Sequence, residues 1–329
     1  MAREDLDHLL LRPGELHFVM AQLRTLGAYV ENSGLDFCWT EADLYGPSTV
    51  RQILEGKHVK RGVDAHLVTL QAVSIMYQDT FFKQHTGLTE SLTEAAENLR
   101  QAYLDGRDIQ QAHAEMTQQI ESLNVLTKMK HFDSMNERRP LFIFVRQYMK
   151  MVMEMMPFIR SVRTGDWNLH LTATKSFVKY FFVHDKLNYV RMIPVYLADM
   201  DALKHNDVDI NEEFLQGNWV VNKNPHVSFC AIGADHALEH INRSMKVSGG
   251  LIGITLNASA RTKFFLIAPE LARLAGEAEE MAGCTLNAKL SHHALPDSTG
   301  QRQRRSIIAL NCTLAGFTNP FTYDSEQQL

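Results

Sequence analysis

The feature that most restricts the fold is a long run of apolar residues at helical spacing in the middle of the chain. These residues follow one another in alternating steps of four and three: Leu141, Val145, Tyr148, Val152, Met155, Ile159 and Val162. This alternation places them on one face of a helix, and such a face is buried against other helices. Pro157 lies within the run and is expected to kink its last turns. The sequence therefore predicts a long helix inside a helical domain.

Helical spacing extends on both sides of this run, from about residue 49 to residue 216. One set of positions predicts the second helix of an antiparallel pair: Ile109, Ala112, Met116, Ile120 and Leu123. The whole helical stretch is expected from Leu88 to Leu126, with Ser91-x-x-Glu94 as a capping-box candidate at its start and a break at Asp105-Gly106. Beyond residue 216 the pattern changes, and residues 218–222 and 227–232 have the composition of two short strands. The fold class expected from these patterns is mainly α.

Composition gives the class of protein. The chain has 329 residues, of which 45% are hydrophobic and 22% charged, as in ordinary globular proteins. No run of about 18 uncharged apolar residues occurs, so a membrane-spanning helix is not expected. Four cysteines lie far apart, which predicts neither a disulfide framework nor a zinc ribbon. A reducing, intracellular location is expected.

Charge is distributed unevenly along the chain. The net charge is −5, but residues 128–191 contain 12 Lys or Arg and 5 Asp or Glu, a net +7 that leaves −12 for the remainder. A basic middle between acidic flanks is compatible with binding of a phosphate backbone. The alternative is a set of solvated helix faces, which is the commoner situation.

Polar side chains are most concentrated in residues 235–250. Leu238, Ile241 and Met245 share one apolar stripe of a predicted helix that ends at Gly249-Gly250. Asp235 stands at the start of this helix, where a carboxylate can cap it or favour its positive end. The remaining faces are polar.

The residue spacing on this predicted helix is compatible with two kinds of metal site. His236, Glu239 and His240 match the pattern H-x-x-E-H, in which two histidines hold zinc and the glutamate activates water. Two partly exposed histidines are the alternative. Asp235 and Glu239 lie one turn apart and could together hold a divalent cation. The structural alternative for Glu239 is a helix ion pair with Arg243.

Several short motifs occur in a fixed order between residues 12 and 282. They are Gly14-Glu-Leu-His17-Phe18, Arg163-x-Gly165-x-Trp167, Asn188-Tyr189-x-Arg191, Pro194-Val-Tyr-Leu-Ala-Asp-Met200 and Asp235-x-x-x-Glu239-x-x-Asn242-Arg243. As an ordered set they resemble uncharacterised animal proteins related to transposase-derived, DDE-type sequences. The resemblance implies an RNase H-like core interrupted by a large helical insertion.

The resemblance also implies a division of the chain. Residues 13–45 and 217–282 would form a partial, truncated RNase H-like α/β element. Residues 49–216 would be the helical insertion. Residues 283–329, where periodicity fades, are expected to form a disordered or peripheral tail.

By the same resemblance, Glu15 and Glu239 stand at two catalytic acid positions, with His17 two residues after Glu15. Two-metal phosphoryl transfer requires three carboxylates. Few residues precede Glu15, too few for the strands that would carry a first aspartate, so the catalytic set is expected to be incomplete. The chain is therefore expected to be a transposon-derived, catalytically inactive module that binds nucleic acid or protein.

DNA is the candidate partner, and the nucleus is a candidate location. The residues proposed to contact nucleic acid are Lys175, Lys179, Arg191, Arg243 and Lys246. Two enzymatic alternatives remain open at this point. One is a metal-dependent transposase or nuclease that uses Mg²⁺ or Mn²⁺ at Asp235 and Glu239. The other is a zinc hydrolase that uses His236, Glu239 and His240.

Overall fold

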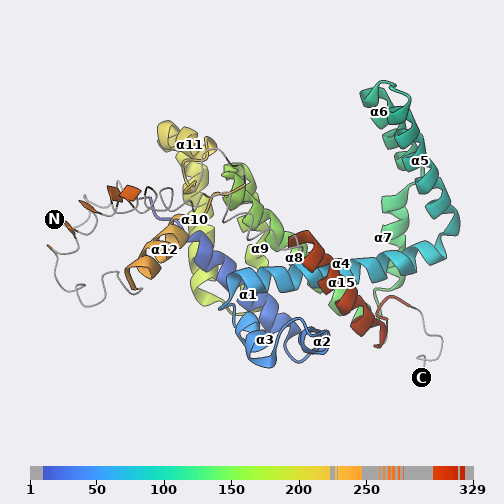
Figure 1. Ribbon diagram of the computed structural model, residues 1–329, viewed down its shortest axis with the longest axis horizontal. Helices are drawn as coiled ribbons and strands as arrows, with labels where there is room; N and C mark the ends of the chain where they lie inside the picture. The colour runs from blue at the N-terminus through green and yellow to red at the C-terminus, as the bar shows by residue number, and fades with distance from the viewer. Residues whose placement is uncertain are drawn as a thin grey trace. The chain divides into compact units, whose positions relative to one another are not determined.

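The computed structural model describes residues 10–222, 227, 229–246, 299–317 and 319–322, together with single positions between 259 and 277. Within this part of the chain the fold is mainly helical and contains no strand (Figure 1). The prediction of a mainly α protein is confirmed. Among the helices of the described residues, none combines the length and apolar character needed to cross a bilayer.

The helices follow one another closely along the chain (Figure 1). Their bounds are α1 Glu15–Val30, α2 Leu35–Glu41, α3 Pro47–Leu54, α4 Val59–Gln84, α5 Thr86–Leu104, α6 Ile109–Ser122, α7 Val125–Met135, α8 Pro140–Thr164, α9 Trp167–Val183, α10 Leu187–Asn206, α11 Val208–Leu215, α12 Ala234–Lys246 and α15 Thr299–Ala315. The long helix predicted from the apolar run is α8, and Pro157 lies inside it.

The expected α/β element has very little β structure in the described residues. Residues 13–45 contain α1 and α2, because their apolar side chains recur at helical spacing. The two predicted strands are reduced to one antiparallel bridge, in which Val221 and Ile232 exchange backbone hydrogen bonds of 2.8 and 2.9 Å. The apolar stretch at residues 251–255 lies outside the described residues.

The chain forms two compact units. Unit 1 comprises Met1–Ala28, Gln52–Val59 and Glu154–Arg305, and unit 2 comprises Tyr29–Arg51, Lys60–Met153 and Ser306–Leu329. These boundaries differ from the expected ones, because residues 13–45 and 49–216 both contribute to each unit. Helical packing sets the boundaries of the units.

Unit 1 is centred on aromatic packing. Phe18 of α1 is fully buried, stacks on Phe158 at 4.3 Å and meets the edge of Phe181 of α9 at 5.3 Å between ring centroids. Helices α9 and α10 pack against each other and contribute Trp167 and Tyr196 to a second cluster. This second cluster borders the candidate functional site.

Unit 2 contains the end of the described chain. Phe321 is buried and meets the edges of Tyr77 and Phe142, with centroids 5.3 and 5.7 Å apart. Leu310 of α15 is fully buried and Leu314, one turn later, packs against the same cluster as Phe321. The expectation of a disordered or peripheral tail is thus corrected for residues 299–322, because this apolar spacing gives the segment a face to bury. Residues 283–298 and 323–329 lie outside the described residues.

Candidate functional site

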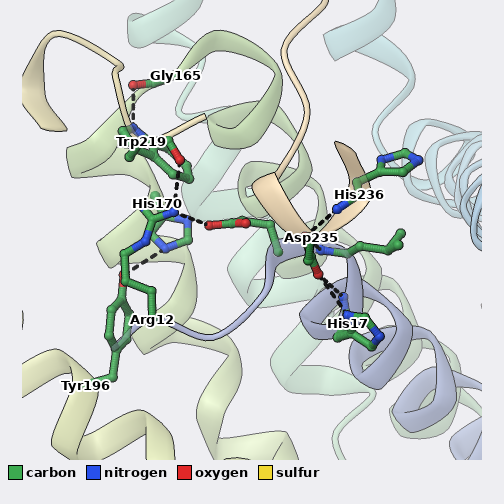
Figure 2. Close-up of polar contacts among 10 residues, drawn as sticks. Arg12, His17, Gly165, His170, Tyr196, Trp219, Asp235 and His236 are labelled. Carbon is green, nitrogen blue, oxygen red and sulfur yellow. Dashed lines mark hydrogen bonds and ion pairs between the residues drawn. The ribbon is translucent and has the colours of Figure 1, made fainter. Parts of the chain in front are cut away.

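The start of α1 and the start of α12 meet in unit 1, although about 220 residues separate them (Figure 2). Asp235 accepts hydrogen bonds from the backbone N–H groups of Leu16 and His17 at 3.1 Å each, and from the His17 ring at 2.9 Å. The N–H of His236 donates to the same carboxylate at 2.9 Å. Asp235 therefore caps α1, a role that usually falls to the residue just before a helix.

Two glycines allow this close approach. A Cβ added to Gly14 would lie 2.8 Å from Cγ of Asp235. A Cβ added to Gly233 would lie 2.6 Å from Oε2 of Glu15 and 2.8 Å from Oδ1 of Asp235. Any larger residue would push the segments apart. A glycine before α1 also leaves that helix without a side-chain cap of its own, which Asp235 replaces.

Arg12 lies in the segment just before α1 and joins Glu15 to the Trp219 backbone (Figure 2). Its Nη2 donates to Oε1 of Glu15 at 3.0 Å and to the carbonyl oxygen of Trp219 at 2.9 Å. The guanidinium carbon lies 5.1 Å from the ring of Phe214, 5.5 Å from Trp219 and 6.0 Å from Trp167. These three rings, called the Arg12 cage below, supply cation–π contacts to a largely buried cation.

A buried, neutral histidine completes the aromatic surroundings. His170 stacks on Trp167, with centroids 5.2 Å apart and the rings 11° from parallel, and its Nε2 lies 3.1 Å from the Tyr196 hydroxyl. Burial, together with the positive charge of Arg12, lowers the pKa of His170 to about 3. His170 is therefore uncharged at neutral pH and adds no second cation. Trp219 is fixed by its Nε1, which donates to the Gly165 carbonyl at 2.9 Å.

The two carboxylates of the site differ in acidity. Burial raises the pKa of Glu15 above its usual value, the nearby Asp235 adds to the rise, and Arg12 opposes it. Burial also acts to raise the pKa of Asp235, but the hydrogen bonds from Leu16, His17 and His236 outweigh it, and the pKa is lowered. Asp235 thus holds its negative charge more firmly than Glu15 does.

These contacts bear on the catalytic and metal-binding roles predicted for Glu15, Asp235 and Glu239. Glu15 is 3% exposed and paired with Arg12, whereas Glu239 is exposed one turn after Asp235. Each oxygen of Asp235 already meets two hydrogen-bond donors. Across the described residues, no three His, Cys, Asp or Glu side chains are arranged to hold a metal ion. The contacts of Asp235 give it a capping role, and its role as a metal ligand together with Glu239 stays a prediction.

The two histidine rings of the H-x-x-E-H pattern on α12 are arranged differently from the ligands of a zinc site. The rings of His236 and His240 stack on one another, with centroids 4.7 Å apart and an interplanar angle of 20°. A zinc ion requires ring nitrogens that converge on one point. Stacked rings at this spacing favour the alternative of two histidines on a helix surface.

The predicted nucleic-acid contacts all belong to unit 1, on α9, α10 and α12. Lys175, Arg191 and Arg243 are exposed. Lys179 is also exposed, but its Nζ lies 2.7 Å from Oε2 of Glu154. The side chain of Lys246 lies outside the described residues. Exposed cations on three helices are thus available to an anionic partner.

Sequence reasoning missed Arg12, Trp219 and the role of Tyr189, whose hydroxyl donates to the carbonyl of His17 at 2.9 Å. Arg12 comes directly before Pro13-Gly14, a step typical of turns, and this local pattern predicts no contact for its side chain. The sequence does contain a signal for the meeting of Trp167 and Trp219. Two of the three tryptophans in the chain lie two residues after a glycine, Gly165 and Gly217. The two glycines have positive φ and approach each other closely.

Replacing Asp235 with asparagine is expected to lower the free energy of unfolding by about 1–2 kcal/mol at neutral pH. The amide places an N–H₂ donor against backbone N–H groups that need an acceptor. The pKa of Asp235 is lowered from 3.8, so its contribution is present above that pH and is lost as the pH falls through the lower folded value. Urea unfolding should therefore give a constant difference from neutral pH down to about 4 and a smaller one below it.

Glu239→Gln is the matched control, because it makes the same chemical change one turn later on an exposed side chain. It should leave the free energy of unfolding unchanged within about 0.5 kcal/mol. Equal losses in both variants would mean that Asp235 does not cap α1.

Comparison with known proteins places the chain in a family. A family model described as a domain of unknown function, DUF8702, matches residues 1–329. No curated protein and no solved structure gives a significant match. The comparisons therefore supply a family and no activity.

Proposed function

The chain belongs to this family of unknown function, and we propose that it acts as a transposase-derived interaction module that binds nucleic acid without cutting it. The observation that carries the proposal is the use made of Glu15 and Asp235. Glu15 neutralises Arg12 in a buried ion pair, and Asp235 caps α1 with both oxygens. Carboxylates engaged in this way hold the fold together and are not available to bind a catalytic metal ion.

Exposed cations support nucleic acid as the ligand. Lys175, Arg191 and Arg243 extend from three helices of one unit, where phosphate oxygens can reach them without unfolding any element. A protein that contacts phosphates releases counterions, so its affinity falls with salt. A nuclear location belongs to the same proposal.

The test is a fluorescence anisotropy titration of the full chain with duplex DNA over about 50 to 200 mM salt. Three phosphate contacts predict a slope of about −3 when the logarithm of affinity is plotted against the logarithm of salt concentration. A triple variant with Lys175→Gln, Arg191→Gln and Arg243→Gln should lose most of this slope. Lys204→Gln is the matched control, because this exposed lysine of α10 is already paired with Asp201 at 2.8 Å.

Two outcomes would contradict the proposal. Affinity that is indifferent to salt, or unchanged in the triple variant, would remove the phosphate contacts. Nicking of plasmid DNA that requires Mg²⁺ or Mn²⁺ and disappears in Glu239→Gln would show a working nuclease, and the non-catalytic assignment would have to be given up.

The proposal also includes a truncated RNase H-like element. It is supported by the return of residues 233–236 to the start of α1 and by the antiparallel bridge between Val221 and Ile232. In this interpretation, residues 218–222 and 227–232 are the remainder of a sheet. An experimental structure in which these stretches and residues 251–255 form no sheet would remove it.

A further inference from the structure

The hairpin of α5 and α6 in unit 2 has a very small interior. The two helices lie side by side, and Asp108 caps the start of α6 (Figure 1). Between residues 89 and 122, all of which the structure describes, the buried side chains are those of Ala95, Ala102 and Ala112. A buried alanine contributes much less than the roughly 1.5–3 kcal/mol of a buried leucine. The hairpin is therefore weakly held by its own packing.

The hairpin is anchored at its base. Leu88 is buried in the core cluster of unit 2, and Leu92 and Leu123 pack against the same cluster. Residues 93–122, which are all described, do not belong to it. The outer part of the hairpin thus lacks the support that its base receives.

A groove of about 220 Å³ lies along the outer part of the hairpin. Its walls are the three alanines, Leu99 and Met116, with the polar side chains of Asn98, Arg107, Glu115 and Gln119, and most of its exposed lining is polar. The alanines themselves are buried between α5 and α6, where their small side chains let the two helix axes approach closely. The groove therefore offers a partner mainly polar groups, among them Glu115 and Arg107.

Apolar side chains are exposed at the end of the hairpin. Tyr103 is 70% exposed, Leu104 61% and Ile109 37%. They flank the turn at Gly106, whose φ of 66° is left-handed. Clustered exposed apolar and aromatic side chains are typical anchors of protein interfaces.

Charge decides which partner suits this surface. The charged residues of 86–124 are the acids Glu90, Glu94, Glu97, Asp105, Asp108, Glu115 and Glu121 and the cations Arg100 and Arg107. Their net charge of −5 equals that of the whole chain, so the remaining residues sum to zero. A second copy of the hairpin and a nucleic acid would both be repelled, whereas a basic partner would be attracted.

We infer that the α5–α6 hairpin is a docking surface for a basic amphipathic helix of another protein. The apolar face of that helix covers the exposed Tyr103 and Leu104 at the end of the hairpin, and its lysines and arginines face the surrounding carboxylates. Docking supplies the interior that the outer hairpin lacks. The inference concerns unit 2 and does not depend on nucleic-acid binding by unit 1.

The test uses the full chain and a synthetic Lys/Leu peptide of about 18 residues, five turns of amphipathic helix. Isothermal titration calorimetry at about 150 mM salt, where exposed charges are largely screened, should give a micromolar dissociation constant. A Glu/Leu peptide should not bind, and a scrambled Lys/Leu peptide without helical periodicity should bind at least about tenfold more weakly.

Two variants locate the binding on the hairpin. Glu94→Gln with Glu115→Gln, and separately Tyr103→Ser with Leu104→Ser, should each weaken binding about tenfold, a loss of about 1.4 kcal/mol. Their matched controls are Glu41→Gln with Glu137→Gln, and Leu126→Ser, at exposed positions outside the hairpin. These controls should bind as the unmodified chain does.

Three results would overturn the inference. Absence of peptide binding, or equal binding by hairpin and control variants, would show that the hairpin is not the docking surface. Self-association in light scattering that Tyr103→Ser with Leu104→Ser abolishes would make a second copy the occupant. Circular dichroism of each variant tests that the helices remain folded.

Discussion

Replacing Gly27 with alanine is expected to lower the free energy of unfolding of unit 1 by about 3 kcal/mol. Gly27 lies where α1 crosses α3, and an ideal Cβ there would overlap the carbonyl oxygen of Leu54 and lie 2.7 Å from its carbonyl carbon and Cα. Backbone atoms cannot move aside as the end of a flexible side chain can. The two helices have to separate, which loosens the packing around Leu23 and Leu26, both fully buried. Urea unfolding followed by circular dichroism measures the loss.

Gly87→Ala is the matched control. Gly87 lies in the first turn of α5, and an added Cβ would meet no atom within 4 Å. The same substitution should leave stability unchanged or raise it by up to about 1 kcal/mol, because alanine loses less backbone freedom on folding than glycine. Opposite signs at the two positions would attribute the loss to the helix crossing. An unchanged unfolding midpoint for Gly27→Ala would show that α1 and α3 do not need this close contact.

The long helix α8 could be predicted because its own sequence specifies it. The middle of the predicted apolar run, Val145, Tyr148, Val152 and Met155, is buried. Leu141, at the beginning of the run, is 45% exposed. Periodicity therefore identified the buried face and overstated its length, since packing partners and not spacing decide where burial ends.

The α5–α6 pair was predicted from the same kind of signal, with a start at Leu88 close to the observed one, but the capping-box pattern lies inside the helix. Helix α5 begins at Thr86, and Ser91 lies inside it with its hydroxyl donating to the Gly87 carbonyl at 3.0 Å. Leu88 is buried in the core cluster of unit 2, so the first turn of the helix lies before the capping-box pattern. Burial of an apolar residue just before a capping-box pattern can thus place the helix start ahead of that pattern.

The candidate site could be predicted only in part, because its contacts join distant segments. The residues around Asp235 fitted a cap on its own helix, a metal ligand or a catalytic neighbour equally well. Which role it takes depends on where α1 begins, and that position is set by the packing of Phe18 and by the glycines at 14 and 233. The meeting of the two segments that flank the helical insertion was expected from the resemblance, whereas the function of their carboxylates was not.

The capping role has a consequence for the proposed loss of catalysis. A carboxylate that accepts four hydrogen bonds cannot bind a metal ion without releasing some of those donors, which include the first backbone N–H groups of α1. Restoring metal binding at Asp235 would therefore weaken the start of α1. In the proposed non-catalytic module, this side chain therefore serves the stability of α1.

Arg12→Met is expected to lower the free energy of unfolding by about 3 kcal/mol, because it leaves the Glu15 carboxylate buried without its cation. The side chain of Glu15 is 4% exposed, so water cannot take the place of the guanidinium. Methionine has a similar length and keeps an apolar group in the Arg12 cage, so the loss reports the charge and not a cavity. Urea unfolding measures this change as well.

The double variant Arg12→Met with Glu15→Gln should recover the stability to within about 1 kcal/mol of the unmodified chain, because no buried charge remains. The pKa of Glu15 is already raised above 4.5, and losing Arg12 removes a group that lowers it. The unfolded chain then ionises at a lower pH than the folded one, so the deficit of Arg12→Met should grow as the pH rises through the folded pKa and shrink in acid. A deficit that is independent of pH and is not rescued by Glu15→Gln would mean that Arg12 stabilises the site through its aromatic contacts, and that the ion pair with Glu15 contributes little.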